Sequence, residues 1–159
     1  MLRPDVRVDS LAQVTPDLLR RLGVSHALLD LDDTLVASDR DEHVAEAPLL
    51  VSRLIDAGFG VAILSNGKPE RVARVSRLLG VPGVALAGKP FGWAFRRALG
   101  LLPGASPATT AMVGDQLFTD VLGAKRAGLV TVLVRPLTQG KLPHTRLARR
   151  LERMILEER

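Results

Sequence analysis

The sequence predicts an α/β fold in which helices cover both faces of a five-stranded parallel sheet, giving a three-layer sandwich. Two observations support this prediction. Short apolar runs rich in Val, Ile and Leu alternate along the chain with segments of helical periodicity, and no segment is repeated. With 159 residues, the chain is long enough for a single domain, spanning 1–159, with its own core.

The candidate strands are five short apolar runs, and helical patterns lie between them. The strands are expected at Ala27–Leu31, Gly60–Leu64, Val84–Leu86, Thr110–Val113 and Val130–Val134. The helices are expected at Ala45–Ala57, Pro69–Leu79, Phe91–Leu99 and Phe118–Ala127, and a glycine in left-handed conformation is expected to end each of them, at 58, 80, 100 and 128. Before the first strand, Thr15, Pro16 and Asp17 supply the N-cap and first turn of a helix that runs to about Leu22.

Basic side chains gather in two of the predicted helices. Arg71, Arg74 and Arg77 lie three apart on one helix, where they either guide an anionic substrate or form a solvated stripe. A basic C-terminal helix is expected at about 145–157, with two leucines, a methionine and an isoleucine on one face and arginines around the other. This helix either packs on the sheet or lies on an anionic membrane surface, and both interpretations stay open.

Composition excludes several classes of protein. The chain has no cysteine, which rules out disulfides and thiolate metal sites. No apolar run approaches the ~20 residues of a membrane-spanning helix, and the first residues lack the apolar segment of a signal peptide. We therefore expect a cytoplasmic protein, or one peripheral to a membrane. With four Phe, one Trp and no Tyr, base-stacking side chains are scarce, which counts against a nucleic acid partner.

Polar side chains follow four of the predicted strands at the point where each strand ends. They are Asp30, Asp32, Asp33 and Thr34 after the first strand, Ser65 and Asn66 after the second, Lys89 after the third and Asp115 after the fourth. Each one alone has an ordinary interpretation as a turn former, helix cap or solvated loop residue. Together, at one edge of a parallel sheet, they indicate a site for phosphate and a hard cation.

The spacing of these side chains assigns chemistry to several of them. Asp30 and Asp32 lie two apart on extended backbone and so share one side of it. Asp30 and Asp115, at neighbouring strand ends, suit a divalent cation such as Mg²⁺. One metal-neutralised carboxylate can attack phosphorus, and a second can protonate the leaving oxygen and then activate water. Ser65 and Lys89 would hold the equatorial phosphate oxygens.

The motifs together resemble a known family. The order Asp-x-Asp-x-Thr, Ser, Lys-Pro and Gly-Asp-x-x-x-x-Asp is similar to the four motifs of haloacid dehalogenase (HAD) superfamily phosphatases, which implies a Rossmann-like fold. The stretches DLDDTLV, ILSNG, GKPFGWAFRRAL and GDQLFTDVLGAKRAGL resemble the YqeG branch of subfamily IIIA, which is related to mitochondrial phosphatidylglycerophosphate phosphatases. The likeness covers nearly the whole chain. That branch usually has Asn at the position of Asp33, to which we assign no catalytic role.

The resemblance implies catalytic and phosphate-binding roles for five residues. Asp30 would be the nucleophile, forming an aspartyl-phosphate, and Asp32 would be the acid and base. Phosphate would be bound by Ser65, Asn66 and Lys89. An Asp at the second catalytic position fits rapid hydrolysis, because relatives that store a long-lived aspartyl-phosphate carry Thr there.

The resemblance also implies a Mg²⁺ site. Its ligands would be Asp30, Asp115 and the backbone carbonyl of Asp32. Thr34 and Asp120 would support the site, Asp120 through water or through bonds to the ligands.

Neither interval between the motifs is long enough for the cap domain that many HAD phosphatases carry. The stretch from Asp30 to Ser65 must already hold a helix and a strand, and so must the stretch from Ser65 to Lys89. Only Val36–Glu46 is left over, as a short flap. We therefore expect an open site, which suits a phosphate on a bulky carrier such as a lipid.

Three hypotheses about function remain at this point. The leading one is a Mg²⁺-dependent phosphomonoesterase, with phosphatidylglycerophosphate or another anionic phospholipid as the first substrate. The alternative enzyme is a phosphatase of soluble nucleotide or sugar phosphates. A hypothesis of another class is a non-catalytic basic protein that binds RNA or a membrane surface, against which the intact Asp32 argues. The oligomeric state stays open.

Overall fold

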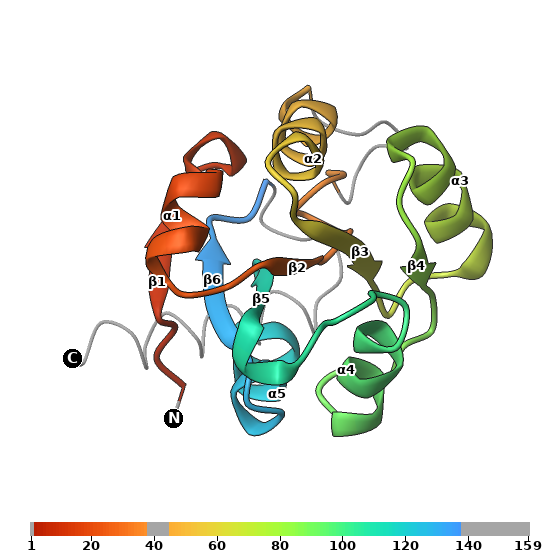
Figure 1. Ribbon diagram of the computed structural model, residues 1–159. Helices are drawn as coiled ribbons and strands as arrows, with labels where there is room; N and C mark the ends of the chain where they lie inside the picture. Colours follow the sequence, from red (N-terminus) through yellow and green to blue (C-terminus); the bar gives the residue numbers. More distant parts are fainter. Residues whose placement is uncertain (1, 38–44, 138–159) are drawn as a thin grey trace.

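The computed structural model describes residues 2–37 and 45–137, which form a parallel sheet of six strands between two layers of helices (Figure 1). The strands are β1 (Val6–Val8), β2 (His26–Leu29), β3 (Gly60–Leu64), β4 (Gly83–Val84), β5 (Thr110–Gly114) and β6 (Val130–Val134), in the spatial order β1-β6-β5-β2-β3-β4. The predicted three-layer α/β architecture is confirmed.

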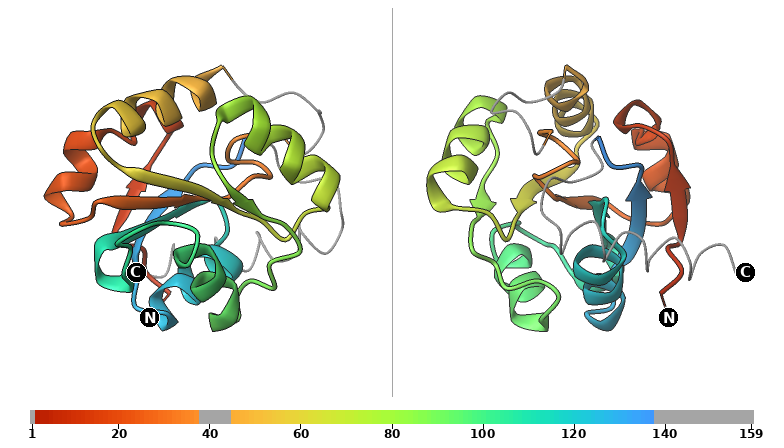
Figure 2. Two further views of the ribbon diagram at one scale, coloured as in Figure 1. Left: turned by 45° about the vertical axis from the view of Figure 1, so that its right-hand side comes forward. Right: turned by 180° about the vertical axis from the view of Figure 1, so that it is seen from behind.

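The helices divide between the two faces of the sheet. They are α1 (Pro16–Arg21), α2 (Glu46–Asp56), α3 (Pro69–Leu79), α4 (Gly92–Leu99) and α5 (Gly123–Arg126), with 3₁₀ turns at Leu11–Gln13 and Pro107–Thr109 and a π-helix at Leu117–Leu122. The first three helices pack on one face, and α4 and α5 pack on the other (Figure 2). The N-cap of α1 is confirmed, because the Thr15 hydroxyl accepts a hydrogen bond from the backbone N–H of Leu18.

Alternation along the central strands builds two separate cores. Leu29 and Ile63 point to the face covered by α1, α2 and α3, whereas Leu28, Ala62 and Met112 point to the face covered by α4 and α5. All five side chains are buried. Strands buried on both faces read as continuous apolar runs, which is why the sequence identifies them well.

The sheet has six strands, so the prediction of five was wrong. The additional strand, β1, pairs in parallel with β6 along a register from Val6–Val132 to Val8–Val134. It has only three residues, and its middle residue, Arg7, is exposed, so the alternation is too short to be recognised. The strand with which β1 pairs, β6, lies far along the sequence, so no local pattern in the sequence predicts that pairing.

Asp5 connects β1 to β6 beside this pairing. Its Oδ2 accepts hydrogen bonds from the backbone N–H (2.8 Å) and the hydroxyl (2.9 Å) of Thr131, and its Oδ1 accepts one from Nζ of Lys125 (3.1 Å). Burial by itself raises the pKa of Asp5, but the hydrogen bonds to Thr131 and Lys125 outweigh that effect, so the net pKa is lowered.

We expect Asp5→Ala to lower the free energy of unfolding by about 1–2 kcal/mol at neutral pH, because hydrogen bonds to a charged acceptor are lost. A lowered pKa means that this stability is present above the unfolded value of about 3.9 and is lost as the pH falls through the folded value. Denaturant unfolding should therefore show that the free energy of unfolding of Asp5→Ala lies below that of the wild type at neutral pH, and that this difference shrinks in strong acid. Asp9→Ala is the matched control, since the carboxylate of Asp9 makes, within the described part of the chain, an exposed 3.8 Å ion pair with Arg135. If Asp5→Ala lowered the free energy of unfolding equally at neutral pH and in strong acid, the prediction would be contradicted.

Two predicted elements have different limits in the structure. The helix expected at Phe118–Ala127 is a π-helix followed by the short α5, and this irregular turn presents Asp120. The strand expected at Val84–Leu86 ends at Val84, because Leu86 has a φ of 45°, in the left-handed region that an extended strand excludes.

One of the four predicted glycine helix ends was also wrong. Gly58, Gly80 and Gly128 have positive φ, but Gly100 has a φ of −64°. The chain continues there in a further turn, in which Leu101 N–H donates to the carbonyl of Ala98 (3.1 Å). The basic helix expected at 145–157, and the flap apart from its ends, lie outside the described residues.

The described residues around the motifs contain no inserted cap domain. Residues 45–65 hold α2 and β3, and residues 65–89 hold α3 and β4. Across 2–37 and 45–137, no helix combines the length and the apolarity that crossing a bilayer requires.

Candidate active site

The site lies where the strand order of the sheet reverses. From β2 the chain continues to β3 and β4 on one side, and it later forms β5 and β6 on the other. Residues just beyond the carboxyl ends of β2 and β5, which pair in parallel, therefore lie side by side at one edge of the sheet. Asp30 directly follows β2, and its backbone N–H donates to the carbonyl of Val113 (2.9 Å), which fixes it beside the end of β5. Asp115 directly follows β5.

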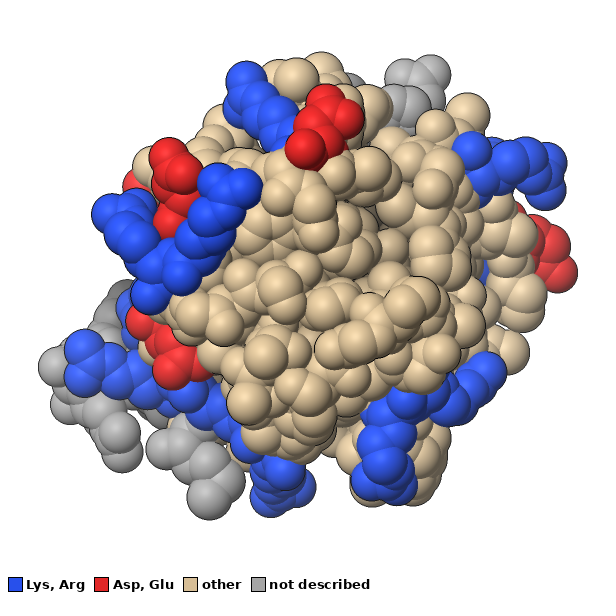
Figure 3. All heavy atoms as spheres, in the orientation of Figure 1, with Lys and Arg blue, Asp and Glu red and all other residues tan. Residues whose placement is uncertain are grey.

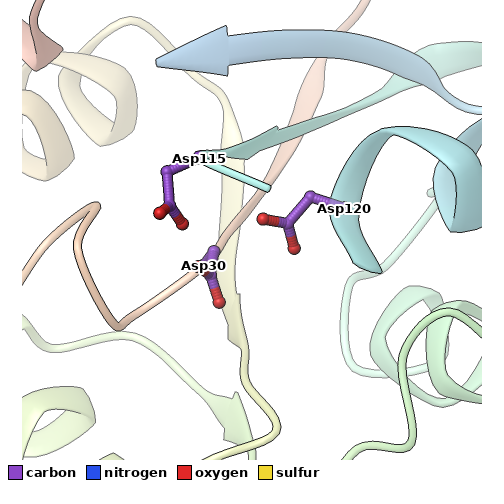
Figure 4. Close-up of side chains that lie close together, drawn as sticks. All are labelled: Asp30, Asp115 and Asp120. Atoms are coloured by element: carbon purple, nitrogen blue, oxygen red, sulfur yellow. The ribbon is translucent and has the colours of Figure 1, made fainter. Parts of the chain in front are cut away.

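Three buried carboxylates converge at this point (Figure 4). Asp30, Asp115 and Asp120 each offer one oxygen, and these oxygens all lie within 4.8 Å of one another. The first two come from strand ends and the third from the π-helix after β5. Like charges repel strongly in buried surroundings, so the cluster is stabilised by cations beside it or by protonation of one carboxylate.

Lys89 supplies one of these cations. Its Nζ donates to Oδ1 of Asp30 (2.7 Å) and to Oδ1 of Asp120 (2.6 Å), and its side chain is 2% exposed. Burial by itself lowers the pKa of Lys89, but the charges of Asp120 and Asp30 more than offset it, so the net pKa is raised. Lys89 is therefore an ammonium at neutral pH. One positive charge against three carboxylates still leaves the cluster negative.

Asp120 is held on both of its oxygens. Lys89 donates to Oδ1, and the backbone N–H of Gln116 donates to Oδ2 (3.1 Å). Burial and the charge of Asp30 raise the pKa of Asp120 and outweigh the opposite effect of Lys89. A Cβ at Gly114 would overlap this carboxylate, so only glycine at the end of β5 lets Asp120 reach the cluster.

Asp32 is the more exposed carboxylate of the site. Its side chain is 41% exposed, and its Oδ1 lies 2.9 Å from Nη2 of Arg71 on α3. Burial raises the pKa of Asp32 and Arg71 lowers it, while Asp30 and Asp33 raise it further, so the net pKa is raised. The contact with Arg71 was not predicted, because in the sequence Arg71 is only one of a stripe of arginines. The signal available there was its position in the first turn of the helix that follows Ser65.

Backbone hydrogen bonds and one hydroxyl fix the loop after β2. The carbonyl of Leu31 accepts from the N–H of Val36 (3.0 Å), and the Thr34 hydroxyl donates to Oδ1 of Asp115 (3.3 Å). Asp33 has a φ of 58°, a conformation that Asp and Asn adopt more readily than other non-glycine residues. Backbone conformation thus accounts for the kind of side chain found at this position.

Ser65 and Asn66 follow β3 and hold the segment that carries Lys89. Asn66 Oδ1 accepts from the backbone N–H groups of Gly88 (3.1 Å) and Lys89 (2.8 Å), and its Nδ2 donates to the carbonyl of Lys89 (3.0 Å). The Ser65 hydroxyl accepts from the N–H of Gly67 (2.9 Å). A Cβ at Gly67 would lie 3.0 Å from that hydroxyl oxygen and 3.4 Å from Oδ2 of Asp32, so the two groups flank one glycine.

The predicted residues thus meet at one edge of the sheet. Asp30, Lys89 and Asp120 form one ion-paired group, and Thr34 is bonded to Asp115. The contact of Asn66 with phosphate and the ligation of metal by the carbonyl of Asp32 stay predictions.

A comparison with protein families decides the class of this site. The family model described as haloacid dehalogenase-like hydrolase matches residues 5–128. The chain belongs to the haloacid dehalogenase-like hydrolase family. It is 37% identical over 153 residues to the Bacillus subtilis protein "Probable phosphatase YqeG", in a match that covers 96% of this chain and 88% of that protein. This HAD-like hydrolase is a phosphatase.

Solved structures of HAD-like proteins share its fold. The cobalt-bound form of deoxy-D-mannose-octulosonate 8-phosphate phosphatase from Haemophilus influenzae superimposes with a TM-score of 0.55 at 18% identity, covering 71% of this chain and 69% of that one. A HAD phosphatase from Thermococcus onnurineus gives a TM-score of 0.54 at 22% identity, covering 64% and 51%. These similarities confirm the Rossmann-like architecture.

The donor set of this HAD-like hydrolase fits a hard divalent cation. The ligand atoms are all carboxylate oxygens, which Mg²⁺ and similar ions prefer, and Lys89 neutralises only part of their charge. Asp120 is less well placed as a ligand than Asp30, because both oxygens of Asp120 already accept hydrogen bonds.

Proposed function

We propose that this HAD phosphatase is a Mg²⁺-dependent phosphomonoesterase that works through an aspartyl-phosphate on Asp30. The observation that carries the proposal is the buried ammonium of Lys89 between Asp30 and Asp120, beside Asp115. A nucleophile, a fixed cation for phosphate and carboxylates for a metal are thereby available at one place.

In the first half of the reaction, a carboxylate oxygen of Asp30 attacks phosphorus and the bond to the ester oxygen breaks. Lys89 stands beside the attacking carboxylate and stabilises the charge that develops on the phosphate oxygens. The Ser65 hydroxyl accepts from Gly67, which leaves its own proton to donate to a phosphate oxygen. Asp32 gives its proton to the leaving oxygen, and its raised pKa favours the protonated form that this requires.

In the second half, water attacks the phosphorus of the aspartyl-phosphate and the bond to Asp30 breaks. Asp32, now a carboxylate, takes the proton of that water. Its side chain is partly exposed, so water reaches it, and Arg71 stabilises its carboxylate form. Inorganic phosphate leaves, and Asp30 is regenerated.

Mg²⁺ would be held by Asp30, Asp115 and the backbone carbonyl of Asp32. When bound, it neutralises the carboxylates and the phosphate oxygens, which otherwise repel one another. Thr34 orients the carboxylate of Asp115 through its hydroxyl. Asp120 supports the site by fixing Lys89.

The proposed substrate is a lipid-borne phosphate, phosphatidylglycerophosphate or another anionic phospholipid. Two features of the described residues support a substrate on a bulky carrier. No cap domain is inserted within 45–89, and the side chain of Asp32 is accessible to solvent. Soluble nucleotide or sugar phosphates remain the alternative substrates.

A non-catalytic protein that binds RNA is less well supported. On the face shown in Figure 3, Lys and Arg side chains lie in separate groups around the edge, and uncharged side chains fill the middle. Binding of single-stranded RNA without sequence preference uses a continuous basic groove lined with aromatic side chains. The catalytic pair of Asp30 and Asp32 is moreover intact.

Release of inorganic phosphate by the purified protein tests the proposal. With Mg²⁺ we expect turnover of a generic aryl phosphate, its loss on chelation, and its recovery when Mg²⁺ is restored. In the same assay, phosphatidylglycerophosphate in mixed micelles should have a higher kcat/KM than a panel of nucleotide and sugar phosphates. Turnover that survives chelation would overturn the Mg²⁺ requirement, and a higher kcat/KM for a soluble phosphate would overturn only the lipid substrate.

A further inference from the structure

Three exposed apolar side chains lie on the segment that carries Lys89. Leu86, Phe91 and Trp93, here called the aromatic rim, are 63%, 57% and 50% exposed. The rings of Phe91 and Trp93 stack with centroids 4.6 Å apart and planes at 10°. The indole of Trp93 lies against Gly88, where an added Cβ would be 2.7 Å from its Nε1. Gly88 directly precedes Lys89, so the aromatic rim borders the phosphate site.

The local backbone holds the aromatic rim outside the core. Leu86 has positive φ, and its N–H donates to the carbonyl of Gly67 (3.0 Å), which fixes the turn after β4. On α4, Ala94 and Phe95 are buried against the sheet, while Trp93 lies on the solvent side of the helix. Three large apolar side chains that keep half or more of their surface exposed beside the site indicate a contact surface.

The charge along this part of the sequence is entirely positive. Between positions 86 and 114 the chain has three Lys or Arg and no Asp or Glu, and of these three Lys89 is buried in ion pairs. Arg96 and Arg97 follow Trp93 by three and four positions on α4, which places them on its side of the helix, and both are exposed. Aromatic and aliphatic side chains flanked by arginines match the interfacial region of a bilayer that contains anionic lipid.

We infer that the aromatic rim docks this phosphatase on the surface of an anionic membrane, with the phosphate site facing the lipid headgroups. The inference rests on the proposed function, because docking delivers a substrate only if a lipid carries it. Single-stranded RNA fits the surface less well. Phe91 and Trp93 stack on each other and so do not present separate faces to successive bases.

The emission of Trp93 tests the docking directly, since Trp93 is the only Trp of the chain and there is no Tyr. Vesicles of equal parts phosphatidylcholine and phosphatidylglycerol should shift the emission of the full chain to shorter wavelength, and bromine-labelled acyl chains should quench it. Vesicles of phosphatidylcholine alone should have a smaller effect, because the arginines then lack anionic partners. An emission spectrum unchanged by anionic vesicles would overturn the inference, as would a response to single-stranded RNA with none to vesicles.

Two variants and a matched control locate the surface. Leu86→Ser and Phe91→Ser should each lower the vesicle partition coefficient about tenfold, since each removes one apolar side chain from the interface. Leu78→Ser should have little effect, because Leu78 is also 63% exposed but lies on α3, across the sheet from α4. An equal loss at Leu78 and Leu86 would overturn the inference.

Hydrolysis of a soluble aryl phosphate separates this inference from the proposed function. The Leu86 and Phe91 variants should keep wild-type turnover of that substrate, which also verifies that they fold. Asp30→Asn should release no phosphate and still bind vesicles as the wild type does. Phosphatase activity without vesicle binding would overturn the docking alone, whereas vesicle binding without activity would overturn the proposed chemistry.

Discussion

Asp30→Asn is expected to reduce phosphate release from an aryl phosphate by at least about a thousandfold. An amide oxygen is a far weaker nucleophile than a carboxylate, so phosphoryl transfer to the chain is lost. The substitution conserves volume, and the amide oxygen still accepts the hydrogen bond that Lys89 donates to Oδ1 of Asp30. The fold is therefore expected to persist, and the loss of activity then reports on chemistry.

Steady-state phosphate release measures this loss, and thermal unfolding of the same sample checks the fold. Asp17→Asn is the matched control, because the carboxylate of Asp17 on α1 is 88% exposed and, among residues 2–37 and 45–137, is paired with Arg20 at 3.5 Å. It should keep wild-type activity. Acid-quenched wild-type protein should in addition carry phosphate on the peptide that contains Asp30. Activity retained by the Asp30 variant would rule out Asp30 as the nucleophile.

Most of the fold could be predicted because each central strand carries its own apolar run. Strands such as β3 and β5 are buried on both faces, so their sequences are apolar throughout and are bounded by turn residues. The edge strand β1 was missed because its three residues are stabilised by a partner more than a hundred positions away. The π-helix before α5 was also missed, since helical periodicity does not distinguish it from an ordinary helix.

The candidate site was predictable to the extent that strand ends determine it. A parallel sheet brings the residues after its strands to one edge, so the sequence is sufficient to group Asp30, Lys89 and Asp115. The contacts of Arg71 with Asp32, and of Asn66 with the Lys89 backbone, depend on how α3 and the loops pack. No spacing rule encodes those distances, so they become visible only in the folded chain.

Lys89→Met is expected to reduce stability and activity together. The methionine fills most of the volume but leaves the carboxylates of Asp30 and Asp120 facing each other in the interior without their ammonium. Breaking a buried ion pair by removing one partner costs about 3–5 kcal/mol of unfolding free energy. Because the pKa of Lys89 is raised in the folded protein, this stability is fully present at neutral pH and is lost only in strong alkali. Phosphate release should fall by at least about a hundredfold, since a charged contact to the transferred group is lost.

Denaturant unfolding at neutral pH measures the loss of stability, with Lys125→Met as the matched control. Lys125 makes a more exposed 3.1 Å ion pair with Asp5, so its replacement should cost only about 1 kcal/mol. Added Mg²⁺ should raise the unfolding midpoint of Lys89→Met more than that of the wild type, because the variant leaves more uncompensated carboxylate charge for the ion to bind. Lys89 and the metal would then neutralise the same carboxylates. A variant that unfolds at the wild-type midpoint would instead mean that protonation of a carboxylate, which the raised pKa of Asp120 favours, already relieves the repulsion.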